Sequence, residues 1–179
     1  MSENPRLVSG IDALNRRIGE GVAWLTLVMV LVTFTIVVLR YAFGIGPVFL
    51  QESVTWMHAA VFMLGGAYAL QRDEHVRVDI FYGRMSPGSR ALVDIIGVLV
   101  LLFPLCAFII YESADYVAAS WSLREGARDA GGLRYPLISL LKSILIVMPV
   151  LVALQGLSLL ITSAQRLAAV TRSDRRPGD

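Results

Sequence analysis

The sequence predicts an all-α membrane protein with four transmembrane helices. Of its 179 residues, 56% are hydrophobic and 17% are charged, with a mean hydropathy of +0.65. Four runs of 18, 19, 17 and 23 residues lack Asp, Glu, Lys and Arg, and a spanning helix needs about 20 apolar residues. These runs are too continuous for the alternating strands of a barrel. They occupy residues 22–39, 53–71, 95–111 and 143–165.

The same composition excludes a soluble enzyme domain and a disordered chain. The single cysteine, Cys106, excludes an intramolecular disulfide. The run at 22–39 is expected to be a retained span rather than a signal peptide, because residues 40–44 offer no small-x-small cleavage site.

The segment before the first run has the pattern of an amphipathic helix. Leu7, Ile11, Leu14 and Ile18 recur at helical spacing among charged residues. Residues 1–21 are therefore predicted to form a cytoplasmic helix lying in the membrane interface. Residues 22–165 form the transmembrane domain, and residues 166–179 are expected to be a basic cytoplasmic tail that is disordered from Arg172 onward.

The distribution of Lys and Arg predicts the orientation. The N-terminus, the second loop and the tail together carry 11, against 5 in the other two loops. Both termini are therefore expected in the cytoplasm. The positive charge indicates sidedness rather than nucleic-acid binding, because aromatic residues are not interleaved with it. The third helix is expected to extend to Gly126, and Pro104 and Pro149 are expected to kink their helices.

The second run is the least suited to lipid on all sides. It holds 5 Leu, Ile, Val or Phe residues, against 12 in each of the other runs. Its Gly65 and Ala69 form a small-xxx-small pair that allows close approach of another helix, in this chain or in a partner. His58 is expected to be either a buried, hydrogen-bonded packing residue or a proton or ion group. One helical stripe contains Gln51, Thr55, His58, Phe62, Gly65 and Ala69.

The chain offers little for catalysis. The two histidines, His58 and His75, are 17 residues apart, or about 25 Å along a helix, which is too far for one metal or haem. The runs contain no carboxylate, and no nucleotide, hydrolase or metalloprotease motif occurs. We therefore expect no catalytic, metal or cofactor site, and a role as a subunit.

Four segments together resemble a known family. They are Arg40 to Gly44, Gln51 to Ala60, Phe62 to Leu70 and His75 to Tyr82. Their order resembles the small membrane subunit of tripartite ATP-independent periplasmic (TRAP) transporters, the DctQ-like family. The sequence of these segments is most similar to the mannitol/chloroaromatic-type subfamily, although Gln51-Glu52 stands where many members have two adjacent acidic residues.

The resemblance implies a sodium-driven importer of organic acids, such as 2-oxo acids or other monocarboxylates, in the inner membrane of a bacterium or archaeon. A periplasmic binding protein (P-type) would deliver the substrate. A large elevator-type subunit (M-type) would hold the substrate and sodium sites. This chain would be a non-catalytic scaffold and anchor without a cofactor of its own.

The resemblance also suggests which residues meet the partner subunit or lipid. Glu52 and Trp56 would contact the large subunit or serve as an interfacial anchor. A charge cluster of Arg72, His75, Arg77 and Asp79 would order its loop, bind the large subunit, bind lipid headgroups or simply be solvated. The expected interface comprises Arg40, Gln51, Glu52, Thr55, Trp56, His58, Gly65, Ala69, Arg72, His75, Arg77 and Asp79.

Two other functions remain open at this point. The chain would fit a haem-binding or structural anchor of a respiratory complex, or a small homo-oligomeric channel. A visible absorption spectrum distinguishes the first, and reconstitution of the chain alone distinguishes the second.

Overall fold

The computed structural model describes residues 6–72 and 82–174, and its regular elements there are all helical. Within those residues, four helices are long and apolar enough to cross a membrane, which confirms the all-α class. The elements are α1 (Arg6–Phe43), α2 (Val48–Gln71), α4 (Pro87–Ile96), the π-helical segment η1 (Gly97–Leu102), α5 (Phe103–Ser122) and α6 (Leu137–Asp174). The segments α4, η1 and α5 follow one another directly and form the third span.

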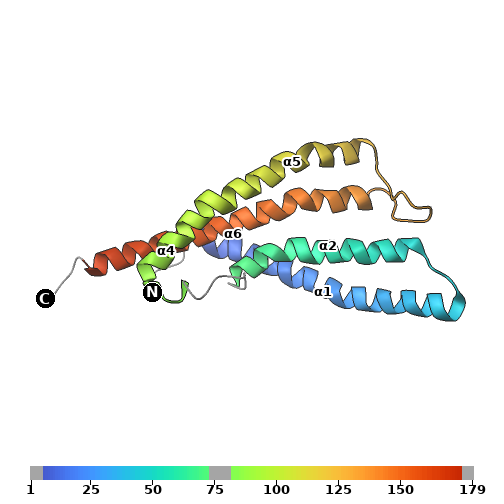
Figure 1. Ribbon diagram of the computed structural model, residues 1–179, viewed down its shortest axis with the longest axis horizontal. Coiled ribbons are helices and arrows are strands. Elements are labelled where there is room, and N and C mark those ends of the chain that lie inside the picture. Colours follow the sequence, from blue (N-terminus) through green and yellow to red (C-terminus); the bar gives the residue numbers. More distant parts are fainter. Residues whose placement is uncertain (1–5, 73–81, 175–179) are drawn as a thin grey trace.

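The helices form two antiparallel hairpins that lie side by side (Figure 1). Helix α1 packs on α2, α5 packs on α6, and α6 also contacts α1, α2 and α4. Helix α6 is therefore the centre of the bundle. We call the end where α1 begins and α6 finishes the terminal end, and the end with the loops at 44–47 and 123–136 the hairpin end.

Helix α1 continues through the expected boundary at residue 21. It contains no proline between Arg6 and Phe43, so nothing interrupts its hydrogen bonding. The face that it buries contains Val8, Ile11, Asn15 and Gly19, whereas Leu7 is 56% exposed. The predicted amphipathic segment is thus continuous with the helix that contains the first uncharged run, and its buried face lies about one residue away from the face predicted.

The far ends of the third and fourth spans also differ from expectation. Helix α6 extends to Asp174, so residues 172–174 are helical rather than disordered; residues 175–179 lie outside the described part. Helix α5 stops at Ser122, before Gly126. The chain reverses at Arg124, whose φ is 49°, and Glu125 donates its backbone N–H to the carbonyl of Ser120. This left-handed turn ends the helix early.

The π-helical segment directly precedes Pro104. The N–H of Phe103 donates to the carbonyl of Val98, five residues earlier. Pro104 has no N–H to donate, so the widened turn lies where the ordinary hydrogen-bond ladder is interrupted. Pro149 remains inside α6 without ending it.

Two glycines set the closest approaches between helices. A Cβ atom at Gly19 of α1 would overlap the Tyr68 ring of α2, and one at Gly156 of α6 would lie 2.7 Å from Leu102 Cδ2. At Gly19 the obstacle is the base of the Tyr68 ring, so only a residue without a side chain fits there, whereas at Gly156 the end of the Leu102 side chain would have to move. These positions therefore fix how α1 meets α2 and how α6 meets the third span.

We expect Gly19→Ala to destabilise the chain by about 1–3 kcal/mol, because the added methyl group collides with the Tyr68 ring. Gly21→Ala is the matched control, since a Cβ there meets nothing within 4 Å. Thermal unfolding in detergent measures both. Equal melting temperatures for the two variants would contradict the close contact.

Candidate functional site

The stripe of Gln51, Thr55, His58, Phe62, Gly65 and Ala69, called the α2 stripe below, faces away from the rest of the chain. Thr55 and His58 are exposed, and Phe62 is 77% exposed. The His58 and Phe62 rings stack with their centroids 6.5 Å apart. A Cβ at Gly65 would meet no atom of the described residues within 4 Å.

These positions remove one of the two expected alternatives, packing on another helix of this chain. His58 is not buried against such a helix, and Gly65 does not provide a close helix contact within the described residues. Helix α2 instead buries the opposite face, which contains Met57, Ala60 and Ala67. The α2 stripe is thus a mixed polar and small-residue surface left open on the outside of the bundle.

Glu52 and Trp56 lie at the hairpin end of α2 and bind the loop at 123–136. The Glu52 carboxylate accepts the backbone N–H of Leu133 at 2.6 Å, and Trp56 Nε1 donates to the carbonyl of Leu137 at 2.9 Å. A Cβ at Gly132 would lie 2.5 Å from Glu52 Oε2, so the glycine lets the loop reach the carboxylate. The intrachain role of both side chains was not foreseen from the sequence.

The third and fourth spans are joined at the same end by polar contacts. The hydroxyl groups of Ser120 and Ser139 are 3.1 Å apart, and Trp121 Nε1 donates to Ser143 Oγ at 2.9 Å. Lys142 Nζ pairs with Glu125 at 2.5 Å and lies 3.9 Å from the centroid of the Tyr116 ring. Because the Lys142 ammonium hydrogen-bonds it, the pKa of Glu125 is lowered from its ordinary value.

The remaining expected residues are separated from one another. Arg40 is exposed in the last turn of α1, where Gly44 ends the helix with a φ of 69° and donates its N–H to the Arg40 carbonyl. Arg72 donates from Nε to the Tyr68 hydroxyl at 2.9 Å and stacks over that ring. The other members of the expected charge cluster, His75, Arg77 and Asp79, lie outside the described residues.

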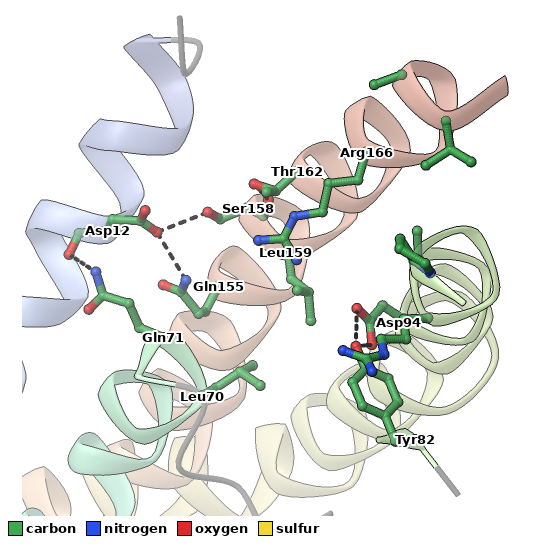
Figure 2. A pocket seen from close by; sticks show the side chains of 15 residues that line it. Asp12, Leu70, Gln71, Tyr82, Asp94, Gln155, Ser158, Leu159, Thr162 and Arg166 are labelled. Atoms are coloured by element: carbon green, nitrogen blue, oxygen red, sulfur yellow. Dashed lines mark hydrogen bonds between the residues drawn. The ribbon is translucent and has the colours of Figure 1, made fainter. Parts of the chain in front are cut away.

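A polar junction that sequence reasoning missed connects three helices at the terminal end (Figure 2). Asp12 Oδ1 on α1 accepts hydrogen bonds from Gln155 Nε2 at 3.0 Å and Ser158 Oγ at 2.9 Å on α6. Gln71 of α2 donates to the Asp12 carbonyl at 3.0 Å, and Asn15 donates to Gln155 Oε1 at 2.8 Å. The polar residues Gln155 and Ser158, which lie within the uncharged run at 143–165, could have indicated this junction.

A cavity of about 660 Å³ lies beside this junction. Its far wall is formed by α4 and the residues just before it, where the Tyr82 hydroxyl donates to the Asp94 carboxylate at 2.9 Å. Figure 2 shows the junction and the Asp94 pair on opposite sides of the opening. No group of three or more potential metal ligands occurs among residues 6–72 and 82–174.

Four helices long and apolar enough to cross a membrane define a multi-pass membrane protein. A family model described as "Tripartite ATP-independent periplasmic transporters, DctQ component" matches residues 29–166. The chain therefore belongs to the DctQ family of TRAP transporter subunits. Searches of curated proteins and of solved structures found no match.

We expect Glu52→Gln to loosen the loop at 123–136, because an amide oxygen accepts the Leu133 N–H more weakly than a carboxylate does. Hydrogen exchange at that loop should rise by about threefold to tenfold, in line with the ~1 kcal/mol of one hydrogen bond. The adjacent Gln51→Ala, on an exposed side chain, is the control. Unchanged hydrogen exchange in Glu52→Gln would show that the bond from the Leu133 N–H to Glu52 does not hold this loop.

We expect acid to weaken the hairpin end through Glu125. A carboxyl group whose pKa is lower in the folded chain stabilises the fold above its ordinary pKa, and this contribution is lost as the pH falls through the lowered value. Melting temperatures of the chain and of Glu125→Gln should therefore differ at pH 7 and converge at low pH. A difference that persists through the acid range would show that ionisation of Glu125 is not involved.

Proposed function

We propose that this chain is the non-catalytic small permease subunit of a sodium-driven TRAP importer for organic acids, of the mannitol/chloroaromatic type. Its cargo would be 2-oxo acids or other monocarboxylates. It would scaffold and anchor the large membrane subunit in the inner membrane of a bacterium or archaeon, with the terminal end in the cytoplasm. The outward-facing α2 stripe is the observation that carries this proposal.

The first argument is energetic. Helix α2 is the least apolar of the four spans, yet only 11% of its most apolar window is buried within the chain. At about −0.3 to −0.6 kcal/mol for each Leu, Ile, Val or Phe, its run gains roughly −1.5 to −3 kcal/mol from lipid, against roughly −4 to −7 for each other run. A helix that gains so little free energy from lipid, and that exposes so much surface, is stabilised best by contact with another protein.

The second argument is geometric. Gly65 lies in open space, so a helix of another subunit can approach its backbone closely. Thr55 and His58 are exposed on the same stripe and can hydrogen-bond across such a contact. The stripe therefore suits a helix of the large subunit better than lipid tails.

The third argument concerns which subunit holds the substrate and sodium sites. The four uncharged runs contain no carboxylate, and no group of three or more potential metal ligands occurs among residues 6–72 and 82–174. Substrate and sodium sites are accordingly proposed for the large subunit, with the periplasmic binding protein delivering the substrate. The role of this chain is then to position the large subunit in the membrane.

Co-expression with the large subunit encoded beside it tests the proposal. A tagged copy should co-purify that protein after detergent extraction, and deletion of this chain should abolish uptake of the organic acid. Separate recovery of the two proteins, with full uptake after deletion, would refute the assignment.

We expect Gly65→Leu to reduce the yield of the complex by about tenfold or more, because the side chain blocks close helix approach. Leu101→Ala, which trims a side chain that is 71% exposed, should leave the yield within about twofold. Gly66→Leu is a matched control on the adjacent face, since a Cβ there also meets nothing within 4 Å. Equal loss in all three variants would show that the partner does not dock on the α2 stripe.

A further inference from the structure

We infer that the cavity at the terminal end binds the headgroup of a glycerophospholipid with a primary ammonium, that is, a phosphoethanolamine headgroup. Its volume of about 660 Å³ is in the range of small-molecule sites, roughly 300–1,000 Å³. Its walls come from α1, α2, α4 and α6, with polar side chains on the inner side and Pro87, Leu159 and Val170 among the apolar ones. A lining that mixes polar and apolar side chains suits a headgroup and its glycerol.

The position of the cavity along α6 fits the membrane boundary. Arg166 is the first charged residue after the uncharged run at 143–165, so it marks the level at which hydrocarbon gives way to headgroups. Ser158 of the polar junction lies eight residues earlier, about 12 Å deeper along the helix. The cavity thus leads from headgroup level to polar groups that lie at the depth of the hydrocarbon.

One side of the cavity lacks an anion. Arg166 is exposed and makes no hydrogen bond or ion pair with any residue in the described part of the chain. Its side chain runs back along α6 toward Ser158 and Leu159 (Figure 2), as long helical side chains do. The other cationic wall residue, Arg90, already donates to the carbonyls of Met85 and Gly83. The free guanidinium is therefore the group that would hold a phosphate.

The polar junction leaves one acceptor free at the cavity wall. Asp12 is half-buried, and only its Oδ1 atom accepts hydrogen bonds from Gln155 and Ser158. A primary ammonium brings a positive charge and three N–H donors, which can pair with the Oδ2 atom of the same carboxylate.

The charges of the described wall residues also favour a zwitterionic headgroup. The described wall carries Asp12 and Asp94 against Arg90 and Arg166, which sum to zero. A zwitterionic headgroup leaves this balance unchanged, whereas a net anionic one does not. A choline headgroup has the same charges but no N–H donor, so it cannot hydrogen-bond to the Oδ2 atom of Asp12. The inference does not rest on the proposed partner, because the α2 stripe is not part of the cavity wall.

Native mass spectrometry of the full-length chain in detergent, titrated with one lipid at a time, tests the inference. Ethanolamine lipid should bind at least about tenfold more tightly than choline or glycerol lipids with the same acyl chains, the lower end of the range for one charge-assisted hydrogen bond. Arg166→Ala should reduce ethanolamine-lipid binding by at least that factor. Arg172→Ala, on the same helix but outside this cavity wall, should leave it unchanged.

The same titration defines the results that overturn the inference. Equal binding of the three lipids, unchanged binding in Arg166→Ala, or an equal loss in Arg172→Ala would each do so. Soluble glycerophosphoethanolamine provides a further arm, and affinity equal to that of the lipid would assign the cavity to a soluble ligand instead. Because Arg166 is exposed and has no described partner, its replacement tests binding without unfolding the chain.

Discussion

The hydrogen bonds between the Asp12 carboxylate and the Gln155 and Ser158 side chains determine how the two halves of this bundle meet. They join α1 to α6, and the donation from Gln71 to the Asp12 backbone carbonyl adds α2 at the same residue. A half-buried carboxylate left without its donors would be costly. Three helices are therefore held together at one residue, through its side chain and its backbone.

The first hairpin is held at a second point as well. Glu52 and Trp56 bind the chain at Leu133 and Leu137, where α6 begins. The two attachments lie at opposite ends of α2, so the hairpin is fixed along its length without using the outer face of that helix. This explains how a weakly apolar helix is held rigidly while its polar and small residues remain open. Such an uncovered face is consistent with the proposed role of holding another protein.

The four spans could be predicted from the sequence because each uncharged run alone is long enough to cross a bilayer. Their ends could not, because residues 6–21 and 166–174 are polar and continue the helices through contacts made in three dimensions. Gly65 was singled out by its spacing to Ala69, but the overlap with the Tyr68 ring occurs at Gly19. Local pattern identifies residues that allow close approach, and only the assembled bundle shows which of them are approached. The polar junction was missed for the same reason, since Asp12 and Gln155 are distant in sequence.

The widened turn in the third span keeps that helix in phase with its neighbour. Its buried residues include Ala91, Val98 and Cys106, at steps of seven and then eight residues. Eight residues of regular α-helix advance about 80° beyond two full turns, which would rotate Cys106 away from the face that Val98 occupies. The π-helical segment between Gly97 and Leu102 takes up the extra residue. The π-helical segment before Pro104 thus keeps Val98 and Cys106 on the same face of the helix. The third span can therefore present one continuous face to α6 although its hydrogen-bond ladder is interrupted at Pro104.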